Sequence, residues 1–220
     1  MLGHYDAFTD WPLLLSAGAP EWVLPMVEAF FGSSREIVRF SYQQRFTTRV
    51  GRLCVPWILR QPAFHPNVGR VFEHIAAGAT EDRDGRPGRR ICVVREQQGT
   101  KRRLTNAEAV TALIESHGFE RVHADQMAFI DQVTLFAETD VAVGEAGSGL
   151  HGTIFSPPGM TTLEMRPETY GGLAQPAIAV LRGHSFTSVT GSSPGTGAMS
   201  HAPWTLDLQT LEQRLDELAL

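Results

Sequence analysis

In the segment Val141-Ala142-Val143-Gly144-Glu145-Ala146-Gly147-Ser148-Gly149-Leu150-His151-Gly152, a short apolar strand runs directly into a glycine-rich loop. Ile154 and Phe155 continue the segment as a short helix. Glycines let a backbone approach a ligand closely, and the free amides at a helix start can bind an anion. Ser148 and His151 add side-chain donors at the same place. Tight strand-to-helix turns also use glycine for steric reasons, so the loop alone is weak evidence for a ligand.

Strands and helices alternate on both sides of this segment. The predicted strands cover residues 91–94, 119–123, 141–143 and 161–165. The first of them is a continuous apolar run, as in strands that are buried in a parallel sheet. The alternating order predicts an α/β sheet with parallel strands and right-handed connections.

The helices between these strands have recognisable ends. Thr105 and Glu108 predict a capping box, with Thr105 at the N-cap, and His117-Gly118 ends that helix. A second helix is predicted over about 128–138. A closing helix from residue 207 carries one apolar stripe, formed by Leu208, Leu211, Leu215 and Leu218.

The chain divides at a polar segment, residues 78–88, that is rich in glycine and charge. Ahead of it, we predict short strands at 22–24 and 37–40 with an apolar helix over 26–31 between them. Further strand structure is predicted at 47–58 and a helix at 66–77. The resulting domains are an N-terminal α/β unit at 1–79, a linker at 80–89, a Rossmann-like domain at 90–204 and a C-terminal helix at 205–220.

Composition excludes several classes of protein. With 220 residues, 42% of them hydrophobic and 20% charged, the chain is neither disordered nor collagen-like nor a coiled coil. A net charge of -5 does not favour nucleic acid as a partner, and two cysteines cannot form a disulfide framework or a thiolate zinc site. No apolar run reaches transmembrane length and no signal peptide is recognisable, so we expect a soluble cytoplasmic protein. The oligomeric state is not predicted.

Basic residues gather between residues 83 and 103, and all but Lys101 are arginines. Arginine suits bidentate recognition of phosphate. We interpret Arg83 to Arg90 as a solvated linker. Arg95, however, directly follows a predicted strand, and the basic loop continues to Arg103. Ligands of open parallel sheets bind beyond the carboxyl ends of the strands, so the arginine loop and the glycine loop together predict a pyrophosphate or sugar-nucleotide site.

Several motifs follow one another in a fixed order: Val94-Arg95, Arg103-Leu104-Thr105-Asn106-Ala107-Glu108, Gly118-Phe119, Asp131-Gln132, Gly147-Ser148-Gly149-Leu150 with Ile154-Phe155, and Leu163-Glu164-Met165-Arg166-Pro167. From Ile91 to Pro167 this order resembles the catalytic half of the family 61 glycosyltransferases, whose bacterial members are often described as capsular polysaccharide biosynthesis proteins. Residues 4–12 loosely resemble an N-terminal segment of that family. Ala146 stands where many relatives carry histidine, and Gly152 where many carry asparagine.

The resemblance implies a GT-B-like α/β architecture of two Rossmann-like parallel-sheet units, the N-terminal one small or truncated. It implies a nucleotide-sugar donor, which we expect to be UDP-linked, a glycan or other hydroxyl acceptor, and inverting transfer without a metal or cofactor. The donor- or phosphate-binding candidates are Arg95, Arg103, Asn106, Gln132, Gly147, Ser148, Gly149, Leu150, His151 and Glu164. Asp10 is the candidate catalytic base, with His4 as the alternative.

Several candidates have a structural alternative. Arg95 could form a salt bridge, Asn106 could begin a helix, Gln132 could form a buried hydrogen bond, and Glu164 could pair with Arg166 instead of ribose hydroxyls. A catalytically inactive nucleotide-sugar-binding or regulatory module also remains open, because of Ala146, Gly152 and the short N-terminal half. A different nucleotide-cofactor enzyme is a weaker alternative, since no Gly-x-Gly-x-x-Gly follows the first strand.

Overall fold

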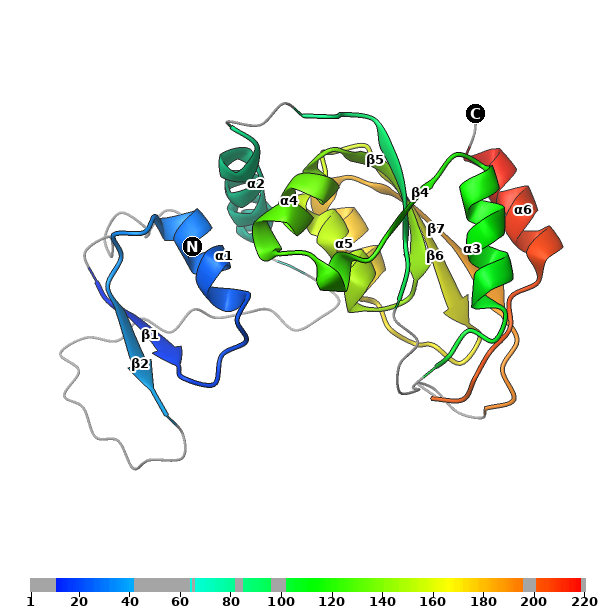
Figure 1. The fold of residues 1–220 in the computed structure, drawn as a ribbon, viewed down its shortest axis with the longest axis horizontal. Helices are drawn as coiled ribbons and strands as arrows, with labels where there is room; N and C mark the ends of the chain where they lie inside the picture. Colours follow the sequence, from blue (N-terminus) through cyan, green and yellow to red (C-terminus); the bar gives the residue numbers. More distant parts are fainter. Residues whose placement is uncertain are drawn as a thin grey trace.

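The computed structural model describes residues 11–41, 64, 66–81, 85–95, 102–195 and 201–218. Most of them form an α/β unit built on a five-stranded sheet in which every strand runs parallel to its neighbours (Figure 1). In chain order the strands are β3 (Arg89–Val93), β4 (Glu120–Val122), β5 (Thr139–Glu145), β6 (Thr161–Pro167) and β7 (Ser185–Gly191). The predicted parallel α/β sheet is therefore confirmed.

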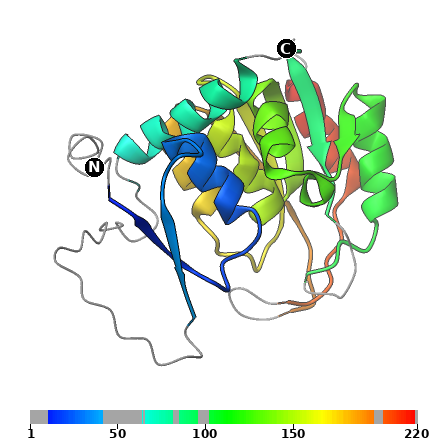
Figure 2. The ribbon, with the colours of Figure 1, turned by 60° about the vertical axis from the view of Figure 1, so that its left-hand side comes forward.

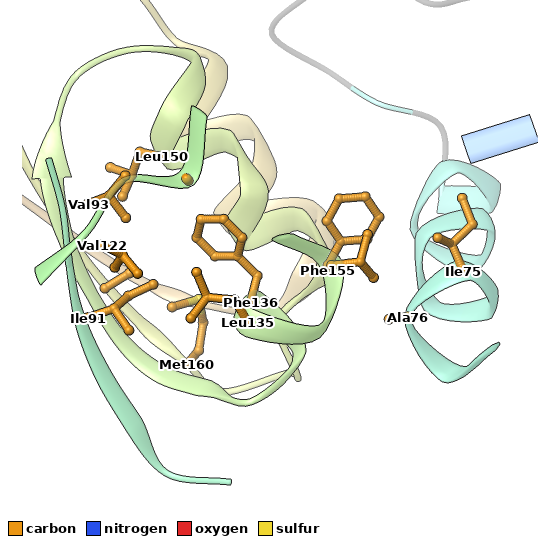
Figure 3. Packing of buried hydrophobic residues seen from close by; sticks show 13 residues of the cluster. Ile75, Ala76, Ile91, Val93, Val122, Leu135, Phe136, Leu150, Phe155 and Met160 are labelled. Carbon is orange, nitrogen blue, oxygen red and sulfur yellow. The ribbon is translucent and has the colours of Figure 1, made fainter. Parts of the chain in front are cut away.

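Helices cover both faces of this sheet (Figures 1 and 2). One face carries α2 (Pro66–Thr80), α4 (Phe129–Ala137), the 3-10 helix η4 (Ser148–Phe155) and α5 (Ala174–Arg182), and the other carries α3 (Ala107–Ser116) and α6 (Leu208–Glu217). Side chains alternate across a strand, so Ile91 and Val93 join the core under α2 and α4 (Figure 3), whereas Cys92 joins the core under α3 and α6. The sheet is buried on both sides, which explains the continuous apolar run at 91–94.

The spatial order of the strands, β4-β3-β5-β6-β7, reverses direction once. From β3 the chain moves outward to β4, and then returns to place β5 on the other side of β3. The loops that follow β3 and β5 therefore diverge from neighbouring strands at the carboxyl edge. In open α/β sheets this switch point is where ligands bind.

A smaller sheet lies N-terminal to this unit. It pairs β1 (Leu13–Ser16) with β2 (Ile37–Phe40) in parallel, and α1 (Val23–Phe31) connects the two strands (Figure 1). Met26 and Phe30 of α1 are partly buried against the core under α2 and α4. The two-Rossmann-unit GT-B arrangement and the domain boundaries stay predictions, because the described structure of residues 11–41 consists of this two-stranded sheet and α1.

Most predicted elements are confirmed, and the exceptions have physical reasons. The strand predicted at 22–24 is wrong, because Val23 begins α1 and Trp22 is its N-cap. Proline is tolerated in a first helical turn, so Pro25 does not oppose the helix. The first strand instead lies at Leu13–Ser16, where no strand was predicted. The strand predicted at 47–58 lies outside the described residues.

The predicted capping box is also wrong. Asn106 is the N-cap of α3, and no side chain caps the helix. The Oγ1 of Thr105 lies 2.5 Å from the Oγ1 of Thr205, so its hydrogen bond goes to the segment after β7. That segment runs beside the start of α3, where the backbone of Trp204 bonds with those of Arg103 and Thr105.

The ends of the main unit differ slightly from the prediction. α2 extends to Thr80, into the segment predicted as a linker, and the Thr80 hydroxyl donates to the Ala76 and Ala77 carbonyls. In α6, Leu211 and Leu215 are fully buried, whereas Leu208 is exposed and lies outside the buried stripe. Across the described part of the chain, none of the helices combines the length and apolar composition that spanning a membrane requires.

Candidate functional site

The switch point brings the glycine loop against the end of β3. Val93 pairs with Gly144, and a Cβ atom on Gly144 would lie 3.1 Å from the Val93 carbonyl oxygen and 3.2 Å from Cδ1 of Leu150. Gly144 therefore lets β3, β5 and η4 approach one another closely, and a larger residue there would be tightly packed. Gly147, the N-cap of η4, has φ 156° and ψ -177°, a conformation that is essentially restricted to glycine. Sterics thus account for two of the glycines in the loop.

The first turn of η4 presents its backbone at this edge. Ser148 and Gly149 are exposed, whereas the Leu150 side chain is 1% exposed and packs in the core near Val93 (Figure 3). Amides in the first turn of a helix have no partner within the helix. Ser148 and Gly149 therefore remain candidates for binding an anion, while the Leu150 side chain is a structural anchor for the turn.

Arg102 is the arginine that faces the glycine loop. Its Nη2 lies 4.0 Å from the position that a Cβ on Gly147 would take, and its guanidinium carbon lies 4.6 Å from the centre of the Tyr170 ring. Its backbone has φ 62° and is held by hydrogen bonds with His201 and Trp204. The Nε and Nη1 atoms are buried, and the described residues offer them no hydrogen-bond partner.

Arg103 was the predicted phosphate ligand, whereas Arg102, the residue before it, was not predicted. Arg103 is exposed, and its carbonyl accepts from the Trp204 amide. Arg102 directly precedes the motif that begins at Arg103, so the sequence offered two adjacent arginines at this point. Arg95 is exposed two residues beyond β3, whereas Arg89, the first residue of β3, pairs with Glu120 and Glu138.

Glu164 lies on β6, near the Arg102 guanidinium. It is 1% exposed, and Arg166, two residues along the strand, donates from Nη1 to its Oε2 at 3.2 Å. Burial raises the pKa of the Glu164 carboxyl, while the positive charges of Arg166 and Arg102 act in the opposite direction. The alternative of an ion pair with Arg166 is therefore confirmed. β6 continues to Pro167, so Glu164 lies within the strand and not at its end.

Asn106 and Gln132 both have structural roles: Asn106 begins α3, which was its alternative, and Gln132 makes a half-buried hydrogen bond. The Asn106 amide donates to the Leu206 carbonyl at 2.7 Å, and its Oδ1 accepts from the Leu206 amide at 3.2 Å. Gln132 donates from Nε2 to the Met127 carbonyl at 3.0 Å. Both side chains secure loops at the carboxyl edge of the sheet.

Ala146 and Gly152, the two departures from the family pattern, both lie against the core. Ala146 is buried, and a Cβ on Gly152 would lie 2.0 Å from Cε2 of Phe136, a fully buried ring. Phe136 thus fills the space that a side chain at 152 would need.

His151, on η4, is half-buried, and this burial lowers the pKa of its imidazole, which favours the neutral form at pH 7.

The candidate base remains a prediction. His4 and Asp10 lie outside the described residues. Within the part of the chain that the structure covers, there is no group of three or more His, Cys, Asp and Glu side chains that could hold a metal ion.

Comparison with known proteins assigns the family. No curated protein matches the chain. The sequence model of the family described as Glycosyltransferase 61 matches residues 11–163, from just before β1 into β6. The match covers most of the chain and includes both the smaller sheet and the switch point of the larger one. The chain therefore belongs to the glycosyltransferase 61 family.

Proposed function

We propose that this chain transfers a sugar from a nucleotide-sugar donor to a hydroxyl acceptor, and that the donor diphosphate binds between Arg102 and the glycine loop. Family membership supports glycosyl transfer. The observation that carries the choice of site is the Arg102 guanidinium, which has two buried nitrogen atoms without a hydrogen-bond partner among the described residues, beside the N-terminal turn of η4.

The energetics of Arg102 favour an anionic ligand. A buried donor without a partner costs about 1–3 kcal/mol, and more when the group is charged. Guanidinium groups donate strong hydrogen bonds to phosphate oxygens, so separate oxygens of a diphosphate would satisfy the Nε and Nη1 donors. One carboxylate, Glu164, lies near the guanidinium groups of Arg102 and Arg166, so when Glu164 is ionised this cluster keeps one positive charge. The first-turn amides of η4 add donors for the same anion.

The same arrangement suits the chemistry of transfer. The diphosphate gains negative charge as it leaves the sugar, and donors aimed at that charge stabilise the transition state more than the ground state. We further propose direct displacement with inversion, without a bound metal ion, and a UDP-linked donor. Asp10 is the proposed base, with His4 as the alternative.

The test measures the affinity for UDP by titration calorimetry. Arg102→Ala removes the two unpartnered donors and should weaken binding by about 1.5–3 kcal/mol, the range for hydrogen bonds to charged groups. Arg103→Ala is the matched control, because the neighbouring side chain is exposed, and it should leave the affinity close to wild type. Turnover of the UDP-sugar that binds best should fall with Arg102→Ala as well. Equal UDP affinity in the Arg102→Ala variant and the wild type would refute this site.

A further inference from the structure

Tyr170 lies on the loop that follows β6, and this loop is fixed to the strand end. The Tyr170 amide donates to the Pro167 carbonyl at 2.9 Å. Arg166 donates from Nη2 to the Tyr170 carbonyl, and also reaches the Gly172 carbonyl at 3.5 Å. Arg166 is itself paired with the buried Glu164. The position of the Tyr170 backbone is therefore set from inside the sheet.

The Tyr170 ring connects this loop with the loop after β3. The guanidinium carbon of Arg102 lies 4.6 Å from the ring centre and that of Arg166 lies 5.1 Å from it. β5 separates β3 from β6, so the ring spans two loops that leave non-adjacent strands. Stacking leaves the N–H edge of a guanidinium open to a ligand, because the ring contacts only the planar face. Neither Nε nor Nη1 of Arg102 has a partner in the described part of the chain, so no hydrogen bond at those atoms orients the group.

Gly172 leaves the space in which the ring lies. A Cβ atom at this position would lie 2.4 Å from both Cζ and Oη of Tyr170. A tyrosine ring has few rotamers, so it would have to leave its place beside Arg102. At the neighbouring Gly171, no atom outside the two adjacent residues lies within 4 Å of the would-be Cβ, so an alanine there meets no other part of the described chain. The two glycines offer a way to move the ring without touching the arginine.

We propose that Tyr170 is a positioning residue, whose ring holds the Arg102 guanidinium toward the glycine loop so that its N–H edge meets the donor diphosphate. This inference rests on the proposed function, since it assigns a role within the same site. Attraction between a guanidinium and an aromatic face supplies the orienting interaction. Phenylalanine offers the same face, so the hydroxyl is not required.

The experiment compares UDP affinities, measured by calorimetry. Tyr170→Leu and Gly172→Ala should each weaken binding by about three- to tenfold, which corresponds to the loss of one cation–π contact. Tyr170→Phe and Gly171→Ala should bind UDP like the wild type. In an Arg102→Ala background, Tyr170→Leu should cause no further loss, because the group that it positions is gone.

The outcomes separate the role of Tyr170 from the proposed site. Wild-type affinity in Tyr170→Leu and Gly172→Ala, with the expected loss in Arg102→Ala, overturns the role of Tyr170 and leaves the proposed site intact. A further loss from Tyr170→Leu in the Arg102→Ala background also overturns it, because the effect then does not pass through Arg102. If Arg102→Ala itself binds UDP normally, the proposed site and this inference both fail. Should Tyr170→Leu not fold, the Gly172→Ala and Gly171→Ala pair decides.

Discussion

Replacement of Gly152 by alanine should destabilise the protein through a single clash in the core. The new Cβ would lie 2.0, 2.3 and 2.6 Å from three atoms of the Phe136 ring. Carbon atoms pack at about 3.5–4.0 Å, so the ring or η4 must move by about 1.5 Å. Phe136 is fully buried beside Leu135 and Met160 in the core (Figure 3), so the movement disturbs its neighbours. Overpacking of this kind costs about 1–3 kcal/mol, and the short distances favour the upper half of that range.

Equilibrium unfolding in urea measures this loss, with the fluorescence of the buried Trp204 among the signals that follow the transition. Gly149→Ala is the matched control on the same helix. Its Cβ would meet only Cγ1 of Val93 at 3.5 Å, an ordinary contact, so its stability should equal or slightly exceed that of the wild type. Combining Gly152→Ala with Phe136→Leu should cost less than the sum of the two single changes, because the smaller side chain relieves the clash.

The reasoning is refuted if Gly152→Ala unfolds at the same urea concentration as Gly149→Ala. It is also refuted if the two changes at 152 and 136 are strictly additive, since the loss would then not arise from their contact. A confirmed clash would explain why this chain carries glycine at position 152.

Two further predictions concern stability. Asn106→Ala should lower the free energy of unfolding by about 1–3 kcal/mol in urea titrations, because it removes both hydrogen bonds to the Leu206 backbone. An unchanged urea midpoint would show that those bonds make no net contribution to stability. Burial lowers the pKa of His184 to about 4 in the folded protein. As the pH falls, the imidazole is therefore protonated in the unfolded chain at a higher pH than in the folded protein. Stability should consequently fall as the pH falls from about 6.5 to about 4. Replacing His184 by leucine should flatten that part of the stability profile, measured in urea at several pH values, and an identical profile in the variant would contradict the assignment.

Local patterns were sufficient to predict the order of the central elements. The apolar run at 91–94 and the strand at 141–143 were recognisable because a strand that is buried on both faces must be apolar throughout. β7 was missed because its sequence, Ser185–Gly191, is largely polar and it lies at the edge of the sheet. The short apolar segment at 22–24 was ambiguous for a related reason, since periodicity cannot distinguish a strand from a helix over three residues.

The sequence by itself determined which loops meet at the candidate site, because parallel strands with right-handed connections bring their carboxyl ends to one edge. It did not determine which of two adjacent arginines faces the glycine loop. Arg102 is selected by its backbone φ of 62° and by its hydrogen bonds with His201 and Trp204, which are about a hundred residues away along the chain. Such long-range pairing leaves no periodic trace in the sequence, so only the tertiary structure could place Arg102 between Tyr170 and Gly147.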